Sequence, residues 1–175
     1  FLNNLTDKTK LVSVTGMSNI LGTVLPVREI TAAAHAKGAL VLVDACQMIV
    51  HQKVDVRDIG CDFLVFSGHK TYGPSGIGVL YGRYEILDSM PPYQFGGDMV
   101  DTVSYQHTTF EEPPARFEAG TPAIVQAVGL GRALQYMSDL GMDNIEAHEV
   151  ELVKYTNERL KEVKGLKVIG NADNK

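Results

Sequence analysis

The sequence has no tryptophan, only two cysteines and no long apolar run. Cys46 and Cys61 form no CxxC pair, which argues against a disulfide framework or a zinc ribbon and favours reduced thiols in a cytoplasmic location. The apolar runs fall far short of the ~20 residues that a membrane-spanning helix needs. Phe1–Lys10 has neither the basic start nor the apolar core of a signal peptide.

Positive charge is also in short supply, since 16 Lys and Arg residues face 21 Asp and Glu residues, for a net charge of -5. This balance argues against a nucleic acid or an anionic membrane as the partner. The five histidines have no second ligand at metal-binding spacing, so we expect no metal site. Hydrophobic residues make up 45% of the 175 residues and charged residues 21%, which is ordinary for a globular domain.

The pattern of apolar residues predicts an α/β fold. Short, β-branched or apolar runs predict strands at Leu11–Thr15, Leu40–Val43, Phe63–Phe66, Gly76–Tyr81 and Leu166–Ile169. Helical spacing predicts helices between Pro26 and Gly38, at Val56–Ile59, from Ala123 to about Leu140, and at Asn144–Val163. Continuous apolar strands separated by helices are typical of a mostly parallel sheet, flanked by helices and buried on both faces.

Two features concern the organisation of the chain. Residues 91–118 are rich in Pro, Gly, Thr and Glu with weak periodicity, and an irregular stretch of that length is usually functional. We expect residues 1–150 to belong to a large α/β domain and residues 151–175 to begin a smaller α+β lobe, with the boundary near Glu149–Tyr155. Because the chain starts at Phe1 and ends just after a predicted strand, we expect it to be a central piece of a longer polypeptide.

Polar side chains follow two of the predicted strands. Asp44 ends one strand and is followed by Gln47, while Ser67, His69 and Lys70 come directly after another. In open α/β sheets, ligands bind beyond the carboxyl ends of the strands, so these positions suit a binding site. Asp44 alone could equally be a helix cap, and a lone lysine is most often a solvated surface residue.

Together these residues supply what pyridoxal phosphate requires of a protein. A partly desolvated lysine, here Lys70, can form a Schiff base with the cofactor aldehyde. An acidic residue must pair with the ring nitrogen, a polar donor must reach the ring oxygen, and hydroxyl and imidazole groups must hold the phosphate. Asp44, Gln47, Ser67 and His69 offer one group for each task. The glycines around Lys70 suit close approach of the backbone to a ligand.

Three runs resemble cysteine desulfurases of the SufS-like group, within the class V aminotransferase superfamily of fold-type I pyridoxal phosphate enzymes. They are Val43-Asp44-Ala45-Cys46-Gln47, Phe66-Ser67-Gly68-His69-Lys70 and Tyr72-Gly73-Pro74-Ser75-Gly76-Ile77-Gly78. Ser18-Asn19-Ile20-Leu21-Gly22-Thr23 and Arg116-Phe117-Glu118-Ala119-Gly120-Thr121-Pro122 resemble two further motifs of that group. Order and spacing match over nearly the whole chain.

The resemblance implies a role for each matching residue. Lys70 would be the catalytic lysine that carries the cofactor and moves the proton, Asp44 would pair with the ring nitrogen, and Gln47 would reach the ring oxygen. Ser67 and His69 would bind the phosphate. Asn19 would contact the substrate carboxylate. Thr121 would reach the cofactor phosphate of the partner subunit, because the family works as a homodimer.

The resemblance also implies an activity: conversion of L-cysteine to L-alanine, with sulfur passed to an enzyme persulfide and on to an acceptor protein for iron–sulfur cluster assembly. The family's sulfur-accepting cysteine and substrate-clamping arginine match nothing here. We therefore expect the 175-residue chain alone to be inactive, with neither Cys46 nor Cys61 as acceptor. A selenocysteine lyase, another class V aminotransferase-family enzyme and an inert structural fragment are the alternatives.

Overall fold

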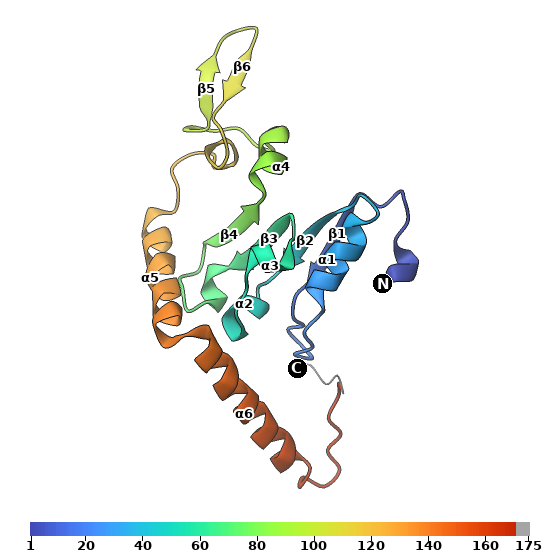
Figure 1. The fold of residues 1–175 in the computed structure, drawn as a ribbon. Helices are drawn as coiled ribbons and strands as arrows, with labels where there is room; N and C mark the ends of the chain where they lie inside the picture. The colour runs from blue at the N-terminus through green and yellow to red at the C-terminus, as the bar shows by residue number, and fades with distance from the viewer. Residues whose placement is uncertain (171–175) are drawn as a thin grey trace.

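The computed structural model describes residues 1–170 and contains one four-stranded sheet, one two-stranded sheet and helices around them (Figure 1). The elements are η1 (Leu2–Asn4), β1 (Leu11–Thr15), α1 (Val27–His35), β2 (Leu40–Asp44), α2 (Met48–His51), α3 (Val56–Ile59), β3 (Phe63–Ser67), η2 (Gly68–Lys70), β4 (Gly78–Gly82), α4 (Tyr84–Ser89), β5 (Val100–Val103), β6 (Thr108–Phe110), η3 (Ala115–Phe117), α5 (Ile124–Leu140) and α6 (Met142–Leu160). The strands and helices predicted before residue 90 and the two long helices after residue 120 are confirmed, with ends shifted by a few residues at most.

The main sheet is mostly parallel, as predicted. Its strand order is β1-β2-β3-β4, in which the first three strands run parallel and β4 runs antiparallel to β3. Gly76 has φ +82°, which places it in the turn before β4 rather than in the strand. The helix α1 joins β1 to β2, and the helices α2 and α3 lie between β2 and β3, because parallel neighbours need a crossover connection.

The core lies between one face of this sheet and the helices α1, α2 and α3. Val12, Val41, Val43 and Leu64 point to this face and form one buried cluster, which also contains residues of all three helices. On α1 the buried residues Val27, Ile30, Thr31 and Ala34 recur at helical spacing, so one stripe of the helix faces the strands.

The prediction that both faces of the sheet are buried is wrong for the described residues. Leu11, Leu40 and Leu80 point to the second face and remain 53%, 36% and 56% exposed. Phe63, at 9% exposed, is the buried side chain on this face, and the residues that line a cavity with it include Leu87 of α4. Alternation along a strand fixes which residues share a face, but not whether another layer covers that face.

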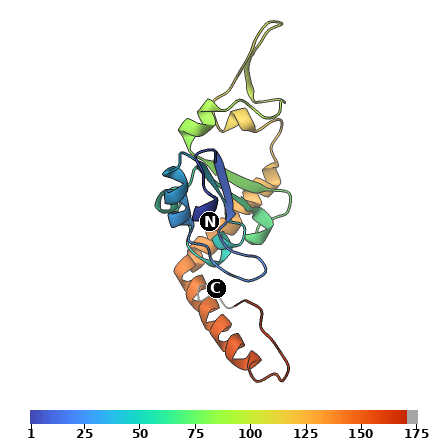
Figure 2. The same cartoon turned by 90° about the vertical axis from the view of Figure 1, so that its right-hand side faces the viewer.

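The molecule is elongated, because a hairpin and a long helix leave the sheet in opposite directions (Figures 1 and 2). The hairpin is formed by β5 and β6, and Tyr105 at its tip is fully exposed. It lies within residues 91–118, which the sequence predicted to be irregular throughout; the β-branched runs Val100–Val103 and Thr108–Phe110 were the missed signal.

The predicted strand at Leu166–Ile169 is wrong. Residues 161–170 contain no strand, and Val168 and Ile169 are 51% and 70% exposed. A β-branched run becomes a strand only when a neighbouring strand satisfies its backbone groups, and no described strand lies in register with this run. The predicted domain boundary near residue 150 falls inside α6, which is continuous, so the division into two domains stays a prediction.

Candidate functional site

The carboxyl ends of three strands meet at one edge of the main sheet. Thr15, Asp44 and Val65 lie side by side in the register of β1, β2 and β3. Beyond the strands, the backbone amide of Gly16 donates to the carbonyl of Asp44 at 2.8 Å, and that of Ala45 donates to the carbonyl of Val65 at 2.9 Å. These hydrogen bonds hold the starts of the loops after β1 and β2 next to each other. We call this end of the sheet, where β1, β2 and β3 end, the carboxyl edge.

Asp44 presents a carboxylate at this edge. Its side chain is exposed, and its Oδ1 accepts a hydrogen bond from the backbone amide of Cys46 at 2.9 Å. This bond orients the carboxylate while other lone pairs remain available for a ligand. Gln47 is half-buried at the N-cap position of α2, three residues further along the same turn.

Lys70 lies on a tight turn that follows β3. The single turn of 3₁₀ helix η2 begins directly after Ser67, and His69 is exposed while Lys70 is half-buried. Thr71 is completely buried, and its hydroxyl donates to the carbonyl of Gly68 at 2.9 Å. That bond closes the turn below Lys70, so the lysine stem leaves a rigid backbone.

Thr71 is a positioning residue that the sequence analysis missed. Its backbone amide also donates to the carbonyl of Gly68, at 3.0 Å, as does the amide of Gly73 at 3.0 Å. The sequence offered no signal beyond the position of this threonine directly after Lys70, because burial depends on how α5 packs over the turn.

Two of the glycines near Lys70 pack closely against other parts of the protein, while the expectation that the glycines let a ligand approach the backbone stays a prediction. A Cβ on Gly68 would lie 2.9 Å from Cγ2 of Ile77, and a Cβ on Gly73 would lie 2.9 Å from the carbonyl oxygen of Gly68. Both positions exclude any larger residue without movement of the backbone. Tyr72 between them has φ +59°, a conformation that costs free energy for a residue with a side chain.

Asn19 lies on the loop that follows β1 at the carboxyl edge. The loop is a tight turn: Oγ of Ser18 accepts the backbone amide of Leu21 at 3.1 Å, and Met17 pairs with Val24 across it. Asn19 itself is exposed. The topology therefore brings Asn19, Asp44, Gln47, Ser67, His69 and Lys70 to the same edge of the sheet.

Thr121 does not join them within this chain. It is exposed on the segment that connects η3 with α5, and no hydrogen bond among the described residues ties its side chain to the carboxyl edge. The resemblance likewise implies that Thr121 serves the cofactor of a partner subunit, and this role stays a prediction.

The two thiols have different surroundings. Cys61 is 1% exposed within the core, and burial is the main cause that raises the pKa of its thiol. Cys46 is half-buried at the carboxyl edge, where the hydroxyl of Ser67 donates to its Sγ at 3.7 Å. Cys61 is therefore part of the hydrophobic core, whereas Cys46 lies at the candidate site.

Metal-binding clusters and membrane-spanning helices are both absent from residues 1–170. No group of three or more His, Cys, Asp or Glu side chains in this range is arranged to hold a metal ion. None of the helices in this range combines the length and the apolar character needed to cross a bilayer.

Comparison with known proteins assigns this arrangement to a family. The model of the family described as aminotransferase class V matches residues 1–175. The chain belongs to the class V aminotransferase family. Among curated proteins, a cysteine desulfurase of Dickeya dadantii is 54% identical over 167 residues, which is 95% of this chain and 40% of the relative. A probable cysteine desulfurase of Halalkalibacterium halodurans is 49% identical, with 95% of this chain and 41% of the relative covered.

Solved structures share the fold. The cysteine desulfurase CsdA of Escherichia coli superposes with a TM-score of 0.89 at 36% identity, over 93% of this chain and 41% of that chain. A mutant of C-DES with glycine covalently linked to its pyridoxal phosphate cofactor gives a TM-score of 0.87 at 26% identity, over 99% and 47% of the two chains. The predicted fold class and family are thereby confirmed. The chain spans about 40% of the length of the curated relatives it matches.

Proposed function

We propose that this chain is the cofactor-binding part of a pyridoxal phosphate-dependent cysteine desulfurase, which converts L-cysteine to L-alanine and passes the sulfur to a cysteine thiol, which thereby becomes a persulfide. The observation that carries the proposal is the convergence of Asp44, Ser67 and Lys70 at the ends of adjacent parallel strands. The 49% and 54% identities to relatives named as desulfurases support the choice of reaction.

The side chains at the carboxyl edge fit pyridoxal phosphate by their chemistry. Lys70 offers an amine for the aldehyde carbon and Asp44 a carboxylate for the ring nitrogen, while Gln47 offers a donor for the ring oxygen. Ser67 and His69 offer a hydroxyl and an imidazole for the phosphate. When bound, the cofactor supplies an electron sink for the bond-breaking step.

Each residue then has one task. Asp44 would keep the ring nitrogen of the cofactor protonated, because a negative charge beside it favours the cationic form. Lys70 would hold the cofactor through its aldehyde, and its amine would move a proton at the substrate carbon. Asn19 orients the substrate through its carboxylate from the loop after β1.

We propose that the sulfur-accepting thiol is neither Cys46 nor Cys61. Burial and a raised pKa both disfavour the thiolate of Cys61. Cys46 is engaged with Ser67 at the base of the site. We therefore assign the acceptor cysteine to another part of the whole protein, together with the smaller lobe that residues 151–175 would begin.

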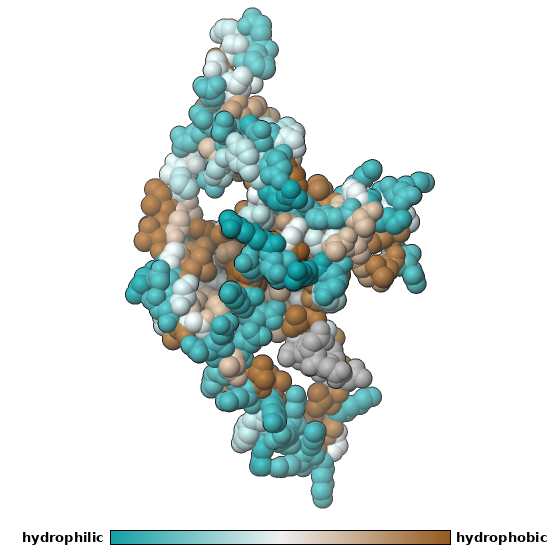
Figure 3. Space-filling view, viewed as in Figure 1, coloured by the Kyte–Doolittle hydropathy of each residue, from teal (hydrophilic) through white to brown (hydrophobic). Residues whose placement is uncertain are grey.

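Assembly and context are finer proposals. Ile124, Val125 and Val128 at the start of α5 are 60%, 80% and 71% exposed, and Figure 3 shows apolar surface over these turns. An exposed apolar stripe of this kind fits a homodimer, in which Thr121, just before α5, would reach the cofactor phosphate of the partner subunit. We also propose a cytoplasmic location and a sulfur-acceptor protein that serves iron–sulfur cluster assembly.

Labelling tests the central assignment. Borohydride reduction of the whole protein with pyridoxal phosphate should fix the cofactor on Lys70, identified by peptide mapping. Lys70→Ala should abolish the label, whereas Lys53→Ala, which changes an exposed lysine that has no assigned role in the site, should leave it unchanged. A label on other lysines only would reject the cofactor site, and a labelled protein that releases no alanine from L-cysteine would reject the desulfurase reaction alone.

A further inference from the structure

The guanidinium of Arg116 joins three segments of the chain. Its Nε donates to the carbonyl of Glu111 at 2.9 Å, its Nη1 donates to the carbonyl of Asp88 at 2.7 Å, and its Nη2 lies 3.2 Å from Oδ1 of Asp88. The side chain is 16% exposed. Arg116 on η3 is therefore tied both to the end of β6 and to the last turn of α4.

These bonds suit an arginine in particular. The last carbonyls of a helix have no partner within the helix, and a cation near them is favoured by the helix dipole. Asp88 lies in that position near the end of α4, and its carboxylate adds a charge-assisted bond. The planar fork of donors on Arg116 reaches all of these acceptors at once, which a lysine with one ammonium group cannot do.

The segment that follows Arg116 is fixed a second time. The backbone amide of Gly120 donates to the carbonyl of Gly97 at 2.8 Å. A Cβ on Gly96 would lie 2.9 Å from Cβ of Ala119, so the two backbones touch. Thr121 comes directly after this second anchor, so the backbone that leads to it is held at Arg116 and again at Gly120.

We propose that Arg116 is a positioning residue for cofactor binding in the partner subunit. It fixes the backbone that presents the exposed Thr121, so that the threonine meets the partner's cofactor phosphate without first being ordered. Preorganisation of this kind lowers the cost of binding. The inference rests on the proposed function, specifically on the assignment of Thr121 across a dimer.

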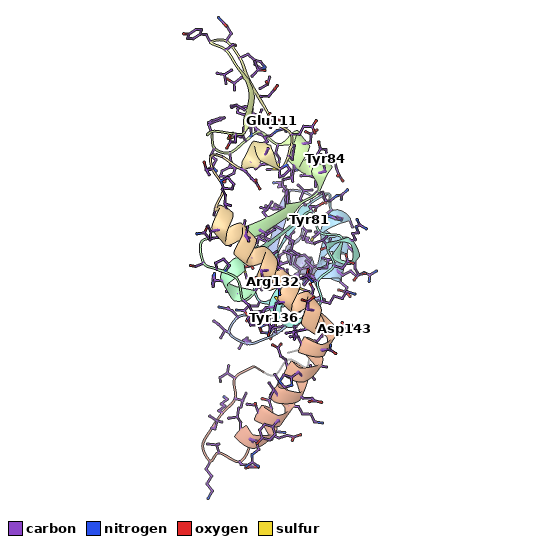
Figure 4. All side chains as sticks on the ribbon, turned by 90° about the vertical axis from the view of Figure 1, so that its left-hand side faces the viewer. Tyr81, Tyr84, Glu111, Arg132, Tyr136 and Asp143 are labelled. Atoms are coloured by element: carbon purple, nitrogen blue, oxygen red, sulfur yellow. The ribbon has the colours of Figure 1, made fainter. Side chains whose placement is uncertain are left out.

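The Arg116 anchor lies toward the opposite edge of the sheet: α4 follows Gly82, which pairs with Phe63 at the start of β3, whereas Lys70 follows the end of β3. Figure 4 shows Glu111 at the base of the hairpin and Arg132 lower down, on α5. Removal of Arg116 should therefore act through Thr121 and not through the lysine site of its own subunit. That separation makes the inference testable with mixed dimers of the whole protein.

In each mixed dimer one subunit carries Lys70→Ala, so that borohydride can fix cofactor only on the other subunit. When Arg116→Gln lies on the Lys70→Ala subunit, the intact site receives its Thr121 from a subunit without Arg116. Half-maximal labelling should then need about tenfold more cofactor, which corresponds to the loss of roughly one hydrogen bond to a charged group. When Arg116→Gln lies on the subunit with the intact lysine, labelling should be unchanged.

Three controls keep the outcomes distinct. Arg116→Lys retains the charge without the fork and should give the same asymmetry with a smaller shift, which covers the case in which Arg116→Gln fails to fold. Arg57→Gln, which changes an exposed arginine on α3, should shift neither arrangement. In the cofactor-free protein, Arg116→Gln should also speed amide hydrogen exchange in residues 118–121.

Thr121→Ala in the same two arrangements separates the inference from its premise. If Thr121→Ala shows no difference between the arrangements, the assignment of Thr121 fails and the inference fails with it. If Thr121→Ala shows the asymmetry and Arg116→Gln does not, or weakens both arrangements equally, only the positioning role of Arg116 is overturned.

Discussion

Two aspartates at opposite ends of the main sheet show how one side-chain type serves two purposes. Asp44 lies exposed at the carboxyl edge, where its carboxylate accepts a hydrogen bond from the backbone amide of Cys46 at 2.9 Å. Asp62 lies just before β3 with 1% of its side chain exposed. It accepts from the backbone amide of Val41 at 2.7 Å and contacts His35 Nε2 at 2.8 Å and Arg83 Nη1 at 3.4 Å.

The difference follows from what surrounds each carboxylate. A buried charge needs partners for its lone pairs, and those of Asp62 come from the end of α1, from β2 and from the residue after β4, so this aspartate ties the fold together. Asp44 has spare acceptors at an open edge where ligands bind. Satisfied groups build the scaffold, and groups left free are available for chemistry.

The largest expected effect comes from breaking the buried member of this pair. Asp62→Ala strips His35, Arg83 and the amide of Val41 of their acceptor, so it should lower the free energy of unfolding by about 3–5 kcal/mol. Asp44→Ala should change it by no more than about 0.5 kcal/mol, as for other exposed positions. Urea unfolding of the whole protein without cofactor measures both. If both variants lost the same free energy of unfolding, the distinction between a structural Asp62 and a free Asp44 would be wrong.

The opposite ranking should hold for activity. Asp44→Asn should still allow cofactor to be fixed on Lys70, yet turnover should fall by about 10²-fold or more, because a neutral amide no longer stabilises positive charge on the ring nitrogen. Asp44→Glu restores the charge and serves as the matched variant. Steady-state release of alanine is the measurement, and near-normal turnover in Asp44→Asn would remove Asp44 from its role.

The two thiols extend the comparison from carboxylates to cysteines. In the cofactor-free protein at mildly alkaline pH, Cys46 should react with iodoacetamide at least about tenfold faster than Cys61, because burial both shields Cys61 and raises the pKa of its thiol. Single variants Cys46→Ser and Cys61→Ser assign the rates by mass spectrometry. In urea the two rates should converge; faster native alkylation of Cys61 would contradict the packing described.

The smallest expected effect concerns Glu85, which forms an ion pair with Arg83, itself a partner of Asp62. The pKa of Glu85 is lowered by a hydrogen bond from its own backbone and then by the guanidinium of Arg83. A carboxyl with a lowered folded pKa contributes stability above its unfolded pKa and loses it as pH falls through the folded value. Glu85→Gln should therefore lower the urea midpoint slightly at pH 7 and make no difference once both pKa values lie above the pH. An equal change of the urea midpoint at pH 7 and at a pH below both pKa values would exclude the charge of Glu85 as the cause.

The sequence by itself determined the elements of the sheet and the residues of the carboxyl edge. Apolar runs such as Leu40–Val43 end at polar residues, and parallel strands place those ends at the same edge of the sheet. The sequence alone was therefore enough to predict that Asp44 and Lys70 lie at the same edge. The motif around Lys70 likewise indicated the family. These features are local in sequence, and periodicity and motif spacing record them directly.

Only the tertiary structure decided the rest. The burial of Thr71 and Asp62, the junction made by Arg116, the exposure of the second sheet face and the failure of Leu166–Ile169 to form a strand all depend on which distant segments come into contact. A strand exists only with a neighbour, and a buried polar group is stable only with its partners. Neither condition is written in the local pattern of residues, because both are set by contacts between segments far apart in the chain.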